Sequence, residues 1–262
     1  MGNNKLLLKT KSVFLCVLMA LLMVGCVSES VSGKEKKPVD KAKALDLQVQ
    51  MAIGYIERGN RDSARLHLTK AFEINKESAS ATNAMAMLYQ LEGEPALAEE
   101  QYKLAIKRDK KYTLAHNNYG VFLYNEKRYP DALAQFELAA ADLAFTNRSQ
   151  ALTNVGRAAM KMGNEVRAKA AFEHACILDK NNSDAFIELA EINFQQQEYA
   201  DAKRNLDAYT SLADNSARSL MLGIRLERVF GNRDKEASLA LMLKNSFPYS
   251  KEYLDYKQKT AN

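Results

Sequence analysis

Small side chains return along this chain at an almost constant interval, and this feature constrains the fold most. One series of alanines has intervals of 34, 34, 36 and 34 residues: Ala64, Ala98, Ala132, Ala168 and Ala202. A second series of small residues has the same intervals: Ala52, Ala86, Gly120, Gly156 and Ala190. Large apolar residues complete the register: Leu68, Tyr102, Phe136, Phe172 and Leu206. Three series in one register indicate a chain built from a repeated unit.

A repeat of 34 residues with this pattern of small and large side chains is the signature of the tetratricopeptide repeat (TPR). Each unit is then two antiparallel helices, A and B, joined by a short turn. Small residues let the two helices approach closely, and large residues such as Phe136 and Phe172 are expected to fill the gap to the next unit. A single unit cannot bury both of its faces, so the units stack. The sequence therefore predicts an all-α fold, a right-handed TPR superhelix of about six helix-turn-helix units.

The register also predicts where the units begin and end. Five clear units and a degenerate sixth unit, offset by about one residue, are expected at 45–78, 79–112, 113–148, 149–182, 183–216 and 217–249, followed by a capping segment at 250–262. Unit three is two residues longer than the others, which predicts a wider loop at 142–147. Gly59, Gly93 and Gly163 suit left-handed ends of A helices, and Pro95 and Pro130 suit the first turn of B helices.

The N-terminus has the pattern of an export signal. Lysines precede an apolar run from Val13 to Val24, which is too short for an ordinary membrane span. The tetrapeptide Met23-Val24-Gly25-Cys26 resembles a bacterial lipobox, in which the peptide is cut before the cysteine and its thiol is lipidated. We therefore predict a lipoprotein signal peptide at 1–25, lipidation of Cys26, and a flexible tether at 26–44. The alternatives are a plain signal peptide or a short membrane anchor.

Charge and reactive residues exclude several functions. Three of the chain's five net positive charges belong to lysines of the predicted signal, so the mature chain is near +2 and predicts no nucleic-acid partner. His67, His116 and His174 lie in different units and form no metal-binding pair. Cys176 is expected to be an inert, core-facing thiol. Without a phosphate-binding loop or a nucleophile motif, the sequence predicts no enzyme, no cofactor, no metal and no small-molecule substrate.

Binding of another protein is the activity that remains. The register places apolar and amide side chains on the outward positions of the A helices, where a stacked array forms a concave groove. The predicted partner-binding residues are Ile53, Ile56, Asn83, Met87, Asn117, Val121 and Tyr124. Such a groove suits an amphipathic helix or an extended peptide. The alternative is that some of these residues pack between neighbouring A helices. Arg157 and Lys161, both in unit four, are too few for a basic carboxylate clamp.

Three stretches resemble one family. They are AHNNYGVFLYNEKRYPDAL at 115–133, TNRSQALTNVGRAAMKMG at 146–163 and SARSLMLGIRLERVFGNRD at 216–234. Together with the lipobox and the 34-residue register, the chain resembles the type IV pilus biogenesis/stability lipoproteins, the outer-membrane pilotins of Gram-negative bacteria. The resemblance implies a six-unit TPR lipoprotein on the periplasmic face of the outer membrane. It also implies that the partner is the type IV pilus secretin, whose localisation and multimer assembly the protein promotes.

Two other functions fit parts of the pattern. A general TPR lipoprotein of the envelope, serving another outer-membrane complex, has the same repeats and the same signal. An envelope enzyme with a TPR platform needs a catalytic segment, and the segments at 27–44 and 250–262 are too short to hold one.

Overall fold

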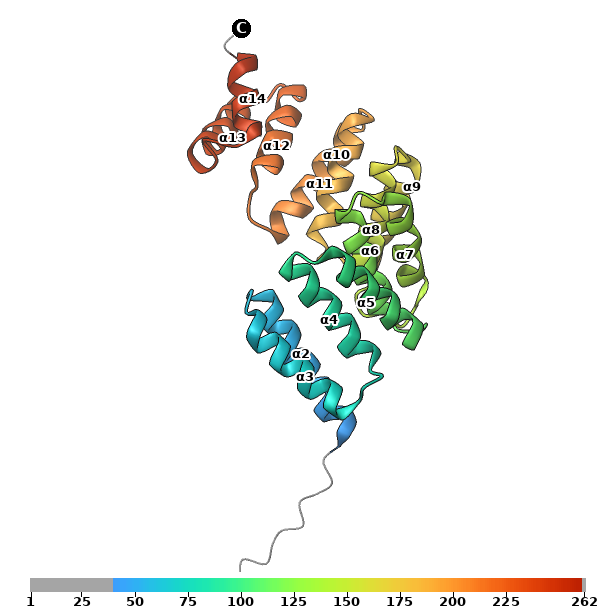
Figure 1. Cartoon of the computed structure of the whole chain (residues 1–262). Helices are drawn as coiled ribbons and strands as arrows, with labels where there is room; N and C mark the ends of the chain where they lie inside the picture. The colour runs from blue at the N-terminus through green and yellow to red at the C-terminus, as the bar shows by residue number, and fades with distance from the viewer. Residues whose placement is uncertain (1–39, 261–262) are drawn as a thin grey trace, which may run out of the picture. The chain divides into compact units, whose positions relative to one another are not determined.

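The computed structural model describes residues 40–260, and this part of the chain forms helices without strands. Almost all of it belongs to one compact unit, Ala42–Asn262. The helices, in chain order (Figure 1), are α2 (Lys41–Glu57), α3 (Arg61–Ile74), α4 (Ala79–Glu92), α5 (Pro95–Arg108), α6 (Thr113–Asn125), α7 (Tyr129–Ala141), α8 (Arg148–Lys161), α9 (Glu165–Leu178), α10 (Ser183–Gln195), α11 (Tyr199–Leu212), α12 (Ala217–Val229), α13 (Arg233–Ser246) and α14 (Lys251–Thr260). Helices α2 to α13 form six successive helix-turn-helix pairs, which confirms the predicted TPR fold.

The turns inside the pairs have left-handed backbone, as their glycines predict. Gly59, Gly93 and Gly163 have φ of 71°, 81° and 75°. Units three and five have no glycine at this place, yet Lys127 and Gln197 take φ of 61° and 63°. The left-handed conformation costs a residue with a Cβ about 1–2 kcal/mol. Packing of the two helices therefore imposes this turn even where the local sequence disfavours it.

The small and large residues of the register meet inside one unit. A Cβ built on Gly120 would lie 2.6 Å from the Phe136 ring, and one built on Gly156 would lie 2.5 Å from the Phe172 ring. Each ring thus packs on its own A helix, and Phe136 also lines a cavity with Asn154 and Arg157 of the next unit, which the rings were predicted to reach. The A helix of each of these units lacks a side chain so that a phenyl ring of its own B helix can enter.

The sixth unit repeats this packing with a shifted register. A Cβ on Gly223 would meet Leu239 at 3.1 Å, and both residues lie one position before the places that the regular interval gives. The degenerate unit is therefore a true helix pair whose register is offset by one residue.

The core runs continuously through the middle of the array. One cluster of buried residues extends from Ala86 in unit two to Ile192 in unit five, with Tyr102, Phe136 and Phe172 as its largest fully buried members. Smaller clusters lie in the first two units, at the junction of units five and six, and beneath α14. Stability therefore depends on contacts between neighbouring units.

One boundary differs from the prediction and another agrees with it. Helix α2 begins at Lys41, inside the segment 26–44 that was predicted as a tether. The connection between α7 and α8 spans 142–147, where the longer unit predicted a wider loop. Cys26 and the predicted signal peptide lie outside the described residues.

Ion pairs join neighbouring units at one repeated position of the B helices. Arg65 Nη2 lies 2.6 Å from Glu92 Oε1, which joins α3 to α4. At the equivalent position of the next B helix the charge is reversed, and Glu99 Oε1 lies 2.9 Å from Arg128 Nη1 beyond α6. Because Lys103 and Arg128 both bind this carboxylate, the pKa of Glu99 falls to about 2.

Candidate functional site

The predicted groove is a pair of shallow cavities along the A helices of the first four units. The first, of about 330 Å³, is lined by Ile56 of α2, Met87 of α4 and Val121 of α6, among others. The second, of about 200 Å³, is lined by Val121 and Tyr124 of α6 together with Asn154 and Arg157 of α8. Val121 borders both cavities. We call the surface formed by Ile56, Met87, Val121 and Tyr124 the apolar face.

The predicted groove residues differ in accessibility. Val121 is the most open, with 37% of its surface exposed. Met87 and Tyr124 are half-buried and border a cavity. Ile53 is half-buried but packs against the core of the first two units instead of lining either cavity. Ile56 is 8% exposed, so it forms the floor of the first cavity.

Each of the predicted amides, Asn83 and Asn117, is hydrogen-bonded to an asparagine of a neighbouring A helix. Asn83 is fully buried, which contradicts its assignment to the partner-binding surface. Its Oδ1 accepts a hydrogen bond from Asn118 Nδ2 at 3.4 Å, between α4 and α6. Asn117 Oδ1 accepts one from Asn154 Nδ2 at 3.3 Å, between α6 and α8. These pairs satisfy buried amides and join consecutive A helices beneath the apolar face.

The A helices of the last three units carry charges instead. Arg157 of α8 lies 3.1 Å from Asp184 and 3.3 Å from Glu188, both on α10. Arg218 of α12 lies 2.8 Å from Glu188 and 3.5 Å from Glu191. Burial alone would raise the pKa of Glu188, but Arg218 and then Arg157 hold it below its usual value. We call this alternating row the ion-pair ladder.

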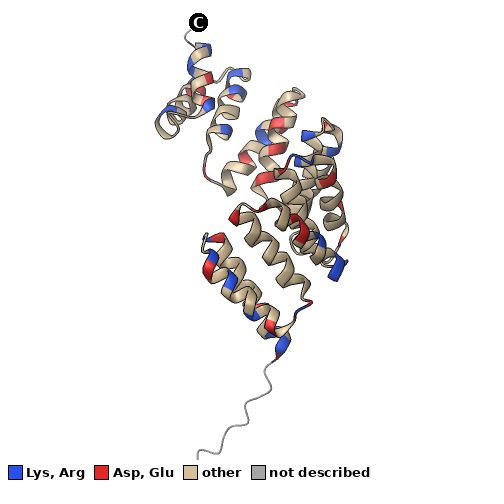
Figure 2. Ribbon diagram, in the orientation of Figure 1, with Lys and Arg blue, Asp and Glu red and all other residues tan. Residues whose placement is uncertain are grey.

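The ion-pair ladder limits what the C-terminal half of the A-helix surface can bind. Arg157 is neutralised by two carboxylates of the chain itself, so it is not free to clamp a partner's carboxylate. Phe194, an outward apolar residue of unit five, lies beneath Arg225, whose guanidinium carbon is 4.0 Å from the ring centroid. Figure 2 shows the contrast, since α4 is charged only at its end, whereas α10 carries acidic residues and α12 carries both signs. The open apolar surface therefore belongs to the first three units.

Two of the three histidines, His67 and His116, join neighbouring helices. Nδ1 of His67 lies 2.8 Å from Gln48 Oε1, and its ring stacks on Tyr55. Nδ1 of His116 lies 2.8 Å from Gln135 Oε1, so this side chain is part of a helix contact and is not simply solvated. Cys176 is half-buried against the core, and burial raises the pKa of its thiol to about 11.

Residues 40–260 offer neither a metal site nor a membrane span. They contain no cluster of three His, Cys, Asp or Glu side chains that could hold a metal ion. No helix in the same range is long and apolar enough to span a membrane.

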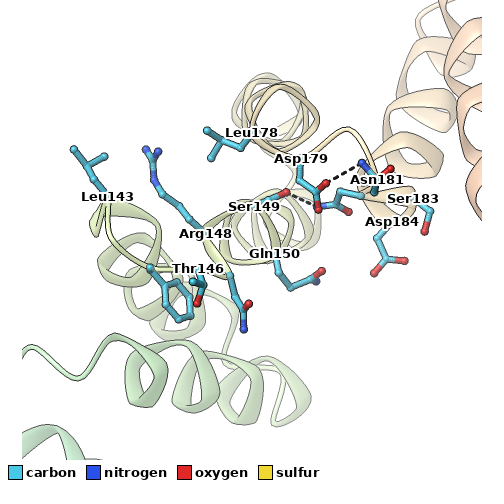
Figure 3. Close-up of a pocket in the computed structure, with 13 residues that line it drawn as sticks. Leu143, Thr146, Arg148, Ser149, Gln150, Leu178, Asp179, Asn181, Ser183 and Asp184 are labelled. Carbon is cyan, nitrogen blue, oxygen red and sulfur yellow. Dashed lines mark hydrogen bonds between the residues drawn. The ribbon is translucent and has the colours of Figure 1, made fainter.

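Repeat-register reasoning missed a cavity of about 650 Å³ between two loops. It lies between the α7–α8 connection and the α9–α10 connection and is lined mainly by polar residues of both loops and of the first turns of α8 and α10 (Figure 3). The only sequence signal for it was the extra length of unit three. We call it the loop cavity.

Comparison with known proteins identifies the relatives of the chain. No family model matches it. It is 36% identical over 242 residues to the type IV pilus assembly protein PilF of Pseudomonas aeruginosa, covering 92% of this chain and 96% of that protein. The solved structure of P. aeruginosa PilF matches with a TM-score of 0.79 and 37% identity, over 84% of this chain and 99% of that one.

Two more distant structures support the fold alone. PilW, described as a widely conserved type IV pilus biogenesis factor, matches with a TM-score of 0.70 at 24% identity, over 82% of this chain and 98% of that one. YrrB, a TPR protein with an unusual peptide-binding site, matches with a TM-score of 0.58 at 21% identity, over 73% and 97%. With a helical repeat array, an apolar face on its first three units and this identity over nearly the whole of both sequences, the chain belongs to the PilF family of type IV pilus assembly proteins.

Proposed function

We propose that this protein is a non-catalytic scaffold of the outer membrane that binds the type IV pilus secretin and promotes its localisation and multimer assembly. The observation that carries the proposal is the apolar face, which remains open where the rest of the A-helix surface is neutralised by its own ion pairs. Membership of the PilF family supports a role in pilus assembly.

The shallow form of the apolar face favours a protein segment over a small molecule. Small-molecule sites usually enclose about 300–1,000 Å³ and bury most of the ligand. The two cavities, of about 330 and 200 Å³, are shallow and meet at Val121. Two adjacent depressions of this kind accept successive side chains of one helix or extended strand. Met87 and Tyr124 then make the apolar contacts on either side of Val121.

The membrane address is proposed to be the lipid on Cys26. Each buried CH₂ of an acyl chain contributes roughly 0.8 kcal/mol, so several chains together anchor a protein stably. The residue after Cys26 is Val27 instead of the aspartate that signals retention in the inner membrane, which favours sorting to the outer membrane. Binding a secretin segment at this surface raises the local concentration of secretin subunits at the bilayer and so favours their assembly.

Separate variants test secretin binding at the apolar face and membrane targeting by the lipid. Val121→Glu places a charge where the two cavities meet and should weaken secretin binding at least about tenfold, as expected for a residue at the centre of an interface. Leu138→Glu is the matched control, because Leu138 lies on α7, is 53% exposed and lines neither cavity. If both variants keep the wild-type helical signal and bind secretin equally well, the apolar face is not the binding surface.

Cys26→Ala tests the address separately. We expect the variant to fold and bind secretin in solution but to leave secretin multimers out of the outer-membrane fraction. Normal multimer levels in that fraction would refute the role of the lipid. Recovery of a different outer-membrane complex in a pull-down, without secretin, would favour the general envelope scaffold instead.

A further inference from the structure

The loop cavity has features of a second recognition site, distinct in its lining residues from the apolar face. It has a volume of about 650 Å³ and shares no lining residue with the two cavities described above. Its wall comes from the longer loop of unit three, where the connection 142–147 replaces the four-residue connection found at 179–182. Insertions in single repeats commonly build loops on a binding face.

Hydrogen bonds hold both walls of the loop cavity in place. Asn182 Nδ2 donates to Ser149 Oγ at 2.8 Å and to Thr153 Oγ1 at 2.9 Å, which joins the α9–α10 connection to helix α8. Asn182 is 8% exposed and Ser149 is 9% exposed. At the start of the α7–α8 connection, Asp142 Oδ1 accepts from the backbone N–H of Ala144 at 2.9 Å. The site is therefore preformed, which lowers the entropy cost of binding.

Arg148 supplies a positive charge that no carboxylate within residues 40–260 neutralises. Its Nε donates to the backbone oxygen of Ala140 at 2.7 Å, which fixes the direction of the guanidinium. Among residues 40–260, no carboxylate forms an ion pair with Arg148. The two carboxylates of the cavity are already engaged, since Asp184 pairs with Arg157 and Asp179 accepts the backbone N–H of Asn181 at 2.9 Å. The free terminal nitrogens of Arg148 thus favour a ligand carboxylate.

Exposed aliphatic side chains accompany this guanidinium. Leu143 is 80% exposed and Leu178 is 44% exposed, and both line the cavity with Arg148. Figure 3 shows the Arg148 side chain pointing to the same side of the cavity as these two leucines. Apolar surface beside a fixed guanidinium matches a carboxylate that is adjacent to an aliphatic side chain. The amides of Gln150 and Asn181 add donors and acceptors for a peptide backbone.

We propose that the loop cavity binds an extended peptide segment of a partner protein in which an Asp or Glu lies beside an aliphatic residue. The Arg148 guanidinium accepts the carboxylate, and Leu143 and Leu178 cover the aliphatic side chain. A peptide fits better than a small molecule because small-molecule sites are lined mainly by apolar side chains, whereas this cavity is mostly polar. The inference does not depend on the identity of the protein bound at the apolar face.

The experiment selects ligands without assuming a partner. A random peptide library displayed on phage is panned against the full mature chain in mild detergent, carrying Val121→Glu so that the apolar face is blocked. We expect enriched peptides to contain Asp or Glu next to Leu, Ile, Val or Met. A synthetic copy of the most enriched peptide should shift backbone amide resonances at 143–150 and 178–184.

Matched variants then test whether Arg148 and Leu143 contact the selected peptide. Arg148→Gln should weaken the peptide at least about tenfold, and Arg148→Lys should bind with intermediate affinity because it keeps the charge but loses the planar fork. Arg233→Gln, at an exposed arginine outside the cavity, should bind as the wild type does. Leu143→Ser, at a side chain too exposed to matter for folding, should weaken binding several-fold. Enriched peptides without an acidic residue, or equal binding to Arg148→Gln, would overturn the proposal.

Discussion

Replacement of Gly156 by alanine is expected to destabilise the protein, although alanine is the better helix former. In an open helix position this substitution stabilises by about 1 kcal/mol. Here the new Cβ would lie 2.5, 2.6 and 2.8 Å from three carbons of the Phe172 ring, which is fully buried and cannot move aside. Overpacking of a close-packed core costs about 1–3 kcal/mol. With three contacts this short, we expect a cost at the upper end and a net loss of about 2 kcal/mol.

A second glycine provides the control. Gly54 lies in the A helix of unit one, and a Cβ there would meet only the flexible guanidinium of Arg58 at 3.6 Å. Gly54→Ala is therefore expected to raise the free energy of unfolding by about 1 kcal/mol. The same Gly→Ala substitution should thus lower the free energy of unfolding at Gly156 and raise it at Gly54.

Urea unfolding followed by far-ultraviolet circular dichroism measures the change in the free energy of unfolding for both variants, and thermal unfolding gives a second measure. For a chain of this size, about 2 kcal/mol corresponds to a fall in melting temperature of roughly 4–8 °C. Phe172→Leu in the Gly156→Ala background should recover part of the loss, because the smaller side chain makes room for the methyl group. If Gly156→Ala raised the unfolding midpoint as Gly54→Ala does, the packing argument would be wrong.

Three further outcomes follow from single side chains. Glu99→Gln should lower stability at neutral pH. Binding of Lys103 and then Arg128 lowers the pKa of Glu99 in the folded chain to about 2. The stabilisation is therefore present above the unfolded pKa of about 4.3 and disappears as pH falls toward 2. Urea midpoints of the two proteins should therefore converge in acid, and a constant difference would contradict this assignment. The thiol of Cys176 has a pKa of about 11 in the folded chain. At about pH 8 it should therefore react with a disulfide reagent roughly a hundredfold more slowly in the folded chain than in urea. Equal rates would show that the thiol is not shielded. Gly93→Ala, at a φ of 81°, should cost about 1 kcal/mol, and an unchanged midpoint would refute backbone strain at this turn.

Much of the architecture was predictable because its signals are local and repeated. The helix pairs, the left-handed turns at Gly59 and Gly93, and the long loop before α8 follow from the interval between small residues and from turn chemistry. The apolar face was predicted in part, since Met87, Val121 and Tyr124 do line cavities. Assignment of Asn83 to it was wrong because the register gives the face of a helix, whereas burial depends on how deeply the neighbouring helix covers that face.

The sequence by itself determined that this chain is an array of helical hairpins, because a fixed interval between small side chains permits only one way of stacking. Only the tertiary structure decided which parts of the array are open. The pairing of Arg157 and Arg218 with Glu188 closes the C-terminal surface through contacts between separate units. Arg148 remains free at the loop cavity because no carboxylate of residues 40–260 comes within reach of its terminal nitrogens. Such pairings depend on the distance between residues that are far apart in the chain, and a periodic pattern does not encode that distance.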